Sequence, residues 1–96
     1  MQSTPNITVR FTAVLQKHVH GNKEIEVQGN NISELLDDLE GRFPGFLRQL
    51  MNDEGELHQF VNIYLNDEDI RYIGGIDTAV KDGDMIDILP ALAGGG

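Results

Sequence analysis

One amphipathic stripe in the middle of the chain limits the possible folds more than any other feature. Five apolar residues recur at the helical spacing i, i+3, i+4, i+7 and i+11: Ile32, Leu35, Leu36, Leu39 and Phe43. This spacing predicts an amphipathic helix with one apolar side and one acidic side. Such a helix has to bury its apolar side against another layer of structure, and the flanking segments predict that this layer is a sheet.

The sequence marks both the beginning and the end of this helix. Asn31 can cap the first turn, and Glu34 stands three residues later, as in a capping box. Pro44 and Gly45 follow the stripe and are predicted to end the helix. The apolar residues between 46 and 51 predict a short second helical turn, and residues 52–55 a loop.

Two alternating segments precede the helix. In residues 6–15, Ile7, Val9 and Phe11 are predicted to face the core of the protein, because alternate residues of a strand share a face. Residues 17–22 contain Gly21-Asn22 and are predicted to form a turn. Residues 24–27 alternate again, so the N-terminal third is expected to form a hairpin.

The segments after the helix are predicted to be mainly strands. Residues 60–65 have the strongest strand pattern, with Val61, Ile63 and Leu65 toward the core. A turn at 66–69, a short strand at 70–73, a helical turn at 77–80, a turn at 81–84 and a last strand at 85–89 are expected to follow. The order β-β-α-β-β-β predicts an α+β fold of the β-grasp type. Its mixed sheet would have about five strands, with the N- and C-terminal strands parallel at the centre.

Composition excludes several classes of protein. The chain has 96 residues, enough for one domain, and a formal net charge of −9, which argues against binding of nucleic acid phosphates. It has no cysteine, so a disulfide, a thiolate nucleophile and a thiolate metal site are all excluded. No apolar run approaches the ~20 residues of a membrane span, and residues 1–5 are not a signal peptide. A cytoplasmic monomer without membrane contact, whose partner has a basic docking surface, is the expectation.

No side chain of this protein is predicted to bind a metal ion or to act in catalysis. His18 and His20 fall on one side of a segment expected to be extended, but no third metal ligand lies nearby, so no metal site is predicted. The acids at 67–69 lack the spacing of a calcium loop. No combination of serine, histidine and acid suggests a catalytic triad.

A partner surface is predicted from the strand alternation instead. Phe60, Tyr64, Met85 and Leu89 should point away from the helix-covered face of the sheet. Clustered apolar residues outside a core usually mark a partner surface. Ala91 and Leu92, which follow the last strand, are expected to extend this surface; the alternative is a different register that buries the four strand residues.

The C-terminal tail is the second informative feature. The six residues after Pro90 have no charged or polar side chain, and they end in Gly94, Gly95 and Gly96. Extended, they would reach roughly 20 Å. Glycine has no Cβ, so such an end can enter a narrow channel and deliver the terminal carboxylate there. The simpler alternative is a frayed terminus without a role.

Four segments carry a family likeness: residues 57–71 (LHQFVNIYLNDEDIR), Asp82-Gly83-Asp84, the strand exit at residues 88–91 (ILPA) and the glycine end. In these segments the chain resembles the ubiquitin-like sulfur carrier proteins of the MoaD/ThiS family. The likeness covers most of the chain and is specific in its C-terminal forty residues. Members that serve an alternative route of cysteine biosynthesis are the most similar. The first forty-five residues resemble the family mainly in pattern and length.

This resemblance implies a domain over residues 1–90 and a flexible tail over 91–96. It implies that an E1-like enzyme uses ATP to adenylate the terminal glycine, after which sulfur replaces AMP to give a thiocarboxylate. The chain itself would bind no cofactor and catalyse nothing. The implied acceptor is a pyridoxal-phosphate cysteine synthase, and a peptidase would release the product from the tail. The family ends in two glycines, so Gly96 is the reactive end, is trimmed, or is foreign to the protein.

Two other functions remain open at this stage. A ubiquitin-like modifier would use the same activation and end as an isopeptide on a lysine. A molybdopterin synthase small subunit would insert its tail into a stable partner enzyme.

Overall fold

The computed structural model describes residues 4–58 and 61–90. The strands are β1 (Asn6–Phe11), β2 (Glu24–Gln28), β3 (Val61–Leu65), β4 (Glu68–Asp69) and β5 (Met85–Pro90). The α-helices are α1 (Ala13–Gln16) and α2 (Ile32–Arg42). Four 3-10 turns complete the elements: η1 (Lys17–Val19), η2 (Leu47–Gln49), η3 (Ile70–Tyr72) and η4 (Gly75–Asp77).

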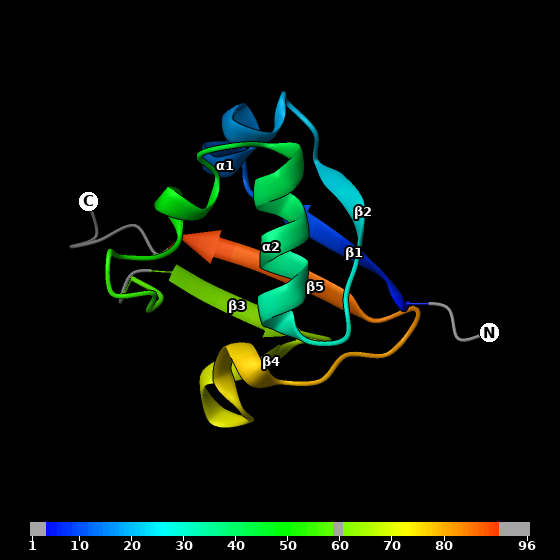
Figure 1. The fold of residues 1–96 in the computed structure, drawn as a ribbon. Helices are drawn as coiled ribbons and strands as arrows, with labels where there is room; N and C mark the ends of the chain where they lie inside the picture. The colour runs from blue at the N-terminus through cyan, green and yellow to red at the C-terminus, as the bar shows by residue number, and fades with distance from the viewer. Residues whose placement is uncertain (1–3, 59–60, 91–96) are drawn as a thin grey trace.

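The strands form one mixed sheet in the order β2-β1-β5-β3-β4. The central pair, β1 and β5, is parallel, and every other neighbouring pair is antiparallel. Helix α2 crosses one face of this sheet (Figure 1). The predicted ubiquitin-like β-grasp fold, with its central parallel pair, is therefore confirmed.

The core lies between α2 and the face of the sheet that it covers. The helix contributes the predicted stripe, in which Leu39 has no exposed surface. The strands contribute alternate residues, as the sequence pattern indicated: Ile7, Val9, Phe11, Val61, Ile63, Leu65, Ile86 and Ile88. Phe11 also packs edge-on against Phe46, with the ring centroids 5.6 Å apart. Helix and sheet thus share one apolar cluster.

Side chains hold both ends of α2; the Asn31 cap at the first end was predicted, whereas the Glu40 contacts near the other end were not. The Asn31 Oδ1 accepts a hydrogen bond from the Glu34 N–H at 2.8 Å, and the Glu34 carboxylate reaches back to the N–H of Asn30 at 2.8 Å. Near the other end, Glu40 accepts hydrogen bonds from the N–H groups of Gly45 and Leu47 at 2.8 and 2.9 Å. These bonds lower the pKa of the Glu40 carboxyl, because they favour its charged form.

The first strand is shorter than predicted. It ends at Phe11, and the chain turns into α1 and η1 rather than continuing extended to residue 15. Leu15 and Val19, four residues apart, are both buried. A helical turn brings residues at this spacing to the same side, so burial of the pair outweighs the local alternation. The segment around His18 and His20 is therefore not extended, and that prediction was wrong.

The segment after β3 also differs from the prediction. Asn66 and Asp67 have φ of 49° and 74°, which suits a two-residue hairpin turn, so residues 68–69 form β4 rather than part of a turn. Residues 70–72 form η3 rather than a strand, because the Asp69 Oδ1 caps the turn by accepting from the Arg71 N–H at 2.9 Å. The later helical turn lies at 75–77 rather than at 77–80.

Candidate functional site

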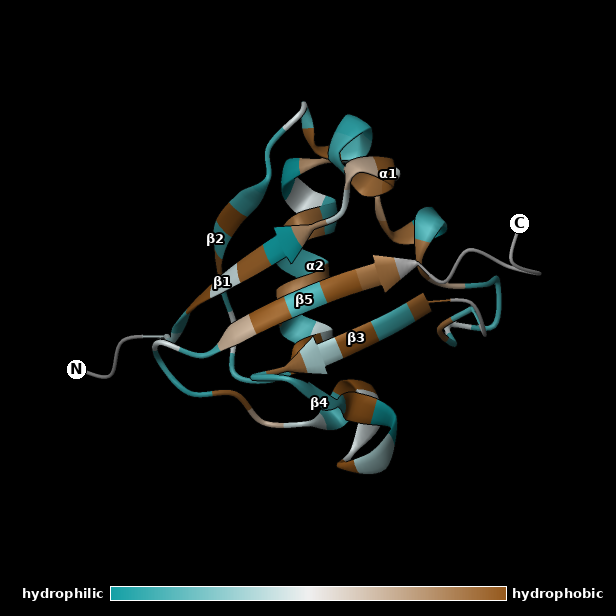
Figure 2. Ribbon diagram, turned by 180° about the vertical axis from the view of Figure 1, so that it is seen from behind, coloured by the Kyte–Doolittle hydropathy of each residue, from teal (hydrophilic) through white to brown (hydrophobic). Residues whose placement is uncertain are grey.

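The face of the sheet opposite α2 is called the open face here, and the strands lie in front of the helix when the molecule is seen from behind (Figure 2). The register places the following side chains on it: Thr8 and Arg10 from β1, Glu24 and Glu26 from β2, Met85, Asp87 and Leu89 from β5, and Asn62 and Tyr64 from β3. Their neighbours along each strand point into the core, because successive strand residues face opposite sides.

An ion pair occupies the middle of the open face. Arg10 of β1 donates to both carboxylate oxygens of Asp87 on β5, from Nε at 2.6 Å and from Nη2 at 2.8 Å. The two residues are directly paired in the parallel register. This hydrogen-bonded carboxylate raises the pKa of the Arg10 guanidinium, and the charges of Asp67 and Glu24 add to the effect. Sequence reasoning missed this pair, since its partners are 77 positions apart.

Beside the ion pair lies a mixed apolar and acidic hollow. It has a volume of about 310 Å³ and is lined by Tyr64, Asp67, Asp87 and Leu89. Tyr64 is half-buried, whereas Leu89 is 38% exposed, a large fraction for a leucine. An exposed leucine beside a tyrosine is typical of a protein-binding surface.

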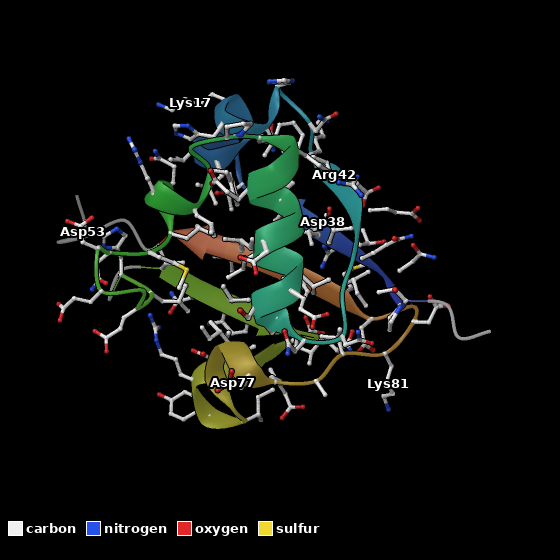
Figure 3. The ribbon with its side chains drawn as sticks, viewed as in Figure 1. Lys17, Asp38, Arg42, Asp53, Asp77 and Lys81 are labelled. Carbon is white, nitrogen blue, oxygen red and sulfur yellow. The ribbon has the colours of Figure 1, made fainter. Side chains whose placement is uncertain are left out.

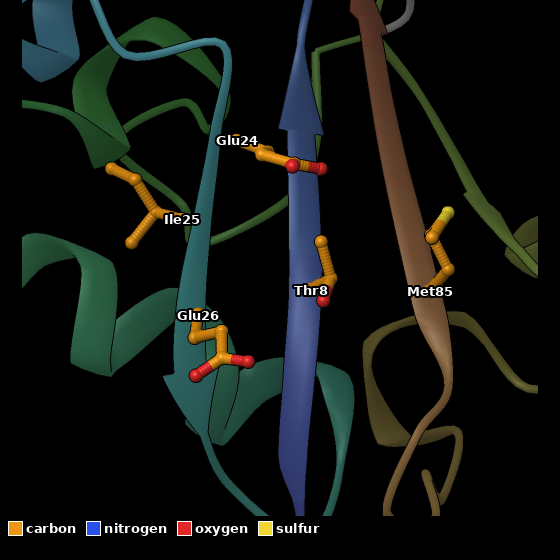
Figure 4. A pocket seen from close by; sticks show the side chains of 5 residues that line it. All are labelled: Thr8, Glu24, Ile25, Glu26 and Met85. Atoms are coloured by element: carbon orange, nitrogen blue, oxygen red, sulfur yellow. The ribbon is translucent and has the colours of Figure 1, made fainter.

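On the other side of the ion pair the open face is acidic. Figure 4 shows a second hollow between β2, β1 and β5, lined by Thr8, Glu24, Glu26 and Met85 on this face. Ile25, which also lines it, points the opposite way, toward the side where the helices lie (Figure 4). The open face therefore has a mixed apolar and acidic part around Tyr64 and Leu89 and an acidic part near β2.

The predicted partner-surface residues fall into two groups. Tyr64, Met85 and Leu89 lie on the open face, and the alternative that they are core residues is wrong. Phe60, Ala91, Leu92, Gly94, Gly95 and Gly96 lie outside the described residues. The last described residue, Pro90, pairs with Val61 at the beginning of β3, so the described end of β5 lies beside the beginning of β3.

Residues 4–58 and 61–90 were also compared with the requirements of a metal site and of a membrane span. There, no three histidine or acidic side chains are placed to hold a metal ion together. Within the same residues, none of the helices has the length and apolar character needed to span a bilayer. Charged side chains are spread over the surface, with Lys17 and Lys81 at opposite ends of the molecule (Figure 3).

Comparison with known proteins gives a consistent result. A sequence model of the ThiS family matches residues 9–95. The sulfur carrier protein CysO of Mycobacterium tuberculosis is 45% identical over 92 residues, covering 94% of this chain and 99% of CysO. The small archaeal modifier protein 3 of Haloferax volcanii is 30% identical over 92 residues, covering 93% of this chain and 98% of its own length.

Among solved structures, a complex of BexX and CysO from Amycolatopsis orientalis contains a chain with a TM-score of 0.86 and 44% identity. The alignment covers 92% of this chain and 98% of that one. Sequence and fold thus agree over nearly the whole length.

Proposed function

This chain belongs to the ThiS family, and from that membership we propose that it is a sulfur carrier protein that bears sulfur on the carboxyl group of its last glycine. The observation that carries the proposal is the full-length similarity to a named sulfur carrier, joined to the three-glycine end. The absence of cysteine agrees with it, because no side chain of this protein could hold the sulfur as a persulfide or disulfide.

The chemistry begins with a carboxylate, which is a poor electrophile. An E1-like enzyme would join the terminal glycine carboxylate to AMP from ATP, releasing pyrophosphate. A sulfide donor would then attack the acyl carbon, AMP would leave, and a thiocarboxylate would remain on the glycine. ATP binds to the activating enzyme in this scheme, and the carrier acts as a co-substrate rather than as an enzyme.

The open face supplies the docking surface in this proposal. Tyr64 and Leu89 would bind an apolar patch of the activating or acceptor enzyme, and Met85 would lie near the edge of the contact. The Amycolatopsis orientalis relative was solved as a complex with a protein, which supports docking to a protein partner. The net charge of −9 favours a partner with basic residues around that patch.

Cysteine biosynthesis is the route that we propose for the sulfur. The acceptor would then be a pyridoxal-phosphate cysteine synthase, and a peptidase would release cysteine from the tail. The carrier would work as a monomer in the cytoplasm between encounters with these enzymes.

A second function is protein modification, which the similarity to a small archaeal modifier protein favours. Activation of the glycine is common to both functions, but a modifier ends as an isopeptide on lysine. Probing a lysate of the source cell for adducts of higher mass separates the two. A molybdopterin synthase small subunit would instead co-purify with a large subunit.

The direct test is intact mass spectrometry after incubation with an E1-like enzyme, ATP and sulfide. Three versions are compared: the full chain, the chain without Gly96, and the chain without Gly95 and Gly96. We expect the mass change of one oxygen replaced by one sulfur, on the last residue, in the first or second version and none in the third. No conversion of any version by a competent enzyme from the same cell would contradict the sulfur-carrier function.

Thermal melting of the same three versions is the control. We expect equal melting temperatures, so that loss of conversion reports on the reactive end alone. A fall of several degrees in the shortest version would mean that the last glycines support the fold, and the proposed role of the tail would lose its basis.

A further inference from the structure

Arg71 ties the η3 turn to the beginning of β3. Its Nη1 donates to the Asn62 Oδ1 at 2.6 Å, and its Nη2 donates to the backbone carbonyl of His58 at 3.1 Å and to that of Val61. Its own backbone N–H is held by the Asp69 Oδ1 at 2.9 Å. A guanidinium is a planar group with donors in fixed directions, so binding these acceptors also fixes their relative positions.

These acceptors lie where β3 has a strand on one side only. On the other side of β3, β4 pairs with Tyr64 and Leu65 and extends no further. In the described part of the chain, therefore, no strand runs along Val61 on that side. Backbone carbonyls at such an edge normally form hydrogen bonds with water, and a strand with an unpaired edge opens easily. Arg71 provides the donor that a neighbouring strand would otherwise supply.

The same residues of β3 hold the end of β5. Val61 is paired with Pro90, and Asn62 is paired with Leu89. These are the last two residues of β5, and the chain continues from them to the glycine end. In Figure 1 the beginning of β3 lies beside the tip of β5. If the first residues of β3 fray, Leu89 and Pro90 lose their pairing partners on that side.

The beginning of β5 is held in a different way. The Asn66 side chain accepts from the Met85 N–H at 3.0 Å, and the Asn66 N–H donates to the Met85 carbonyl at 2.9 Å. Asn66 thus contacts β5 directly, whereas Arg71 acts on the end of β5 only through β3. A polar side chain therefore supports each end of β5: Asn66 at Met85, and Arg71, through β3, at Leu89 and Pro90.

We propose that Arg71 is a positioning residue for delivery of the C-terminal carboxylate. By holding Val61 and Asn62, it keeps Leu89 and Pro90 in register and sets the point from which residues 91–96 leave the sheet. The inference rests on the proposed function, because a fixed exit matters only if the terminus must reach an enclosed site. Loss of pairing at two residues of β5 would add ~7 Å to the length of chain between the sheet and the terminal carboxylate, and would widen the region that the carboxylate can reach.

Arg42 offers a matched control on the opposite edge of the sheet. Its Nη1 donates to the carbonyl of Glu26 on β2 at 3.0 Å, and its Nε and Nη2 donate to Asp38 at 3.3 and 3.1 Å. Figure 3 labels Arg42 and Asp38 on α2, on the side toward β2. Replacing Arg42 therefore removes a guanidinium from an edge carbonyl far from the end of β5.

The first measurement is amide hydrogen exchange, followed by NMR, in wild type, Arg71→Met, Arg71→Lys and Arg42→Met. We expect the amides of Asn62 and Leu89 to exchange about fivefold faster or more in Arg71→Met. The reason is that loss of the Arg71 hydrogen bonds lets the beginning of β3 open locally more often. The amides of Val9 and Ile86 at the sheet centre should change little. Arg71→Lys should be intermediate, because an ammonium is a point donor without the planar fork, and Arg42→Met should leave Leu89 unchanged.

The second measurement is conversion to the thiocarboxylate by the activating enzyme, with kcat and KM determined for each carrier variant. We expect a lower kcat for Arg71→Met with KM nearly unchanged, partial rescue by Arg71→Lys, and wild-type values for Arg42→Met. The reason is that the docking face survives while the carboxylate reaches the ATP site less often.

Three results would overturn the inference. They are unchanged exchange at Leu89 in Arg71→Met, equal acceleration of all amides, and faster exchange at Leu89 with unaltered conversion. A wild-type carrier that is never converted would contradict the proposed function instead, while the exchange data would still decide whether Arg71 holds the end of β5.

Discussion

The two faces of the sheet are made from the same strands but differ in chemistry. On β1, β3 and β5, the described side chains that face α2 are apolar and have almost no exposed surface. The open face alternates with this covered face residue by residue. Among the described side chains it carries the Arg10–Asp87 ion pair, several further polar or acidic side chains, and the apolar Tyr64, Met85 and Leu89. One face is therefore covered by the chain's own helix, whereas the other carries the exposed apolar residues on which the proposed docking depends.

Two leucines allow the most direct test of this contrast. Leu39 lies fully buried on α2, and Leu89 is 38% exposed on the open face. We expect Leu39→Ala to lower the free energy of unfolding by about 2–5 kcal/mol, because it leaves a cavity in the core. Leu89→Ala should cost less than about 1 kcal/mol, since it leaves no closed cavity. Urea unfolding of both variants measures the difference, and equal losses would remove the distinction between the faces.

Two tyrosines test the binding side of the contrast. We expect Tyr64→Ala to weaken binding to the activating or acceptor enzyme by roughly tenfold, as for an aromatic residue in the centre of an interface. Tyr72 is a matched control, because it is 86% exposed on η3 and lies off the open face, so Tyr72→Ala should leave the affinity unchanged.

Titration calorimetry of both tyrosine variants gives the comparison. Equal affinities, together with a large loss of stability in Tyr64→Ala only, would mean that Tyr64 serves the fold and that the docking surface lies elsewhere.

The smallest expected effect is on the free energy of unfolding and comes from the Glu40 carboxylate, on the side of the sheet covered by α2. Folding lowers the pKa of Glu40 below its ordinary value of 4.5, because the carboxylate accepts bonds from Gly45 and Leu47. Its contribution to stability is therefore present above pH 4.5 and is lost as the pH falls through the lower folded pKa. Wild type should be slightly more stable than Glu40→Gln at pH 7.

That difference between wild type and Glu40→Gln should shrink in acid. Denaturant unfolding from pH 7 to pH 3 measures it. A gap that stays constant over this range would show that the ionised form of Glu40 is not what holds the turn after α2.

Much of the fold could be predicted because its signals are local. The stripe of α2, its Asn31 cap and the alternation in β1, β3 and β5 depend on residues within a turn or two of each other. One error arose where packing against the core decided the outcome: residues 13–19 form helical turns because Leu15 and Val19 are buried together. The other was a local signal that was not recognised: residues 70–72 form η3 rather than a strand because Asp69 caps that turn.

The candidate site was predicted in part for the same reason. Alternation alone placed Tyr64, Met85 and Leu89 on one face. It could not find Arg10 and Asp87, which meet only because β1 and β5 are neighbours in a parallel register. The structure shows where Tyr64, Met85 and Leu89 lie, but their partner-binding role stays a prediction. The roles assigned to Gly94, Gly95, Gly96, Phe60, Ala91 and Leu92 stay predictions too.

By itself, then, the sequence determined the main helix and its ends, and which residues of β1, β3 and β5 face inward. The tertiary structure alone decided which strands are neighbours, which charges meet on the open face, and how Arg71 comes to hold the strand beside Pro90. The physical reason is range: caps and periodicity act over a few residues, whereas strand neighbours are selected by burying one shared core.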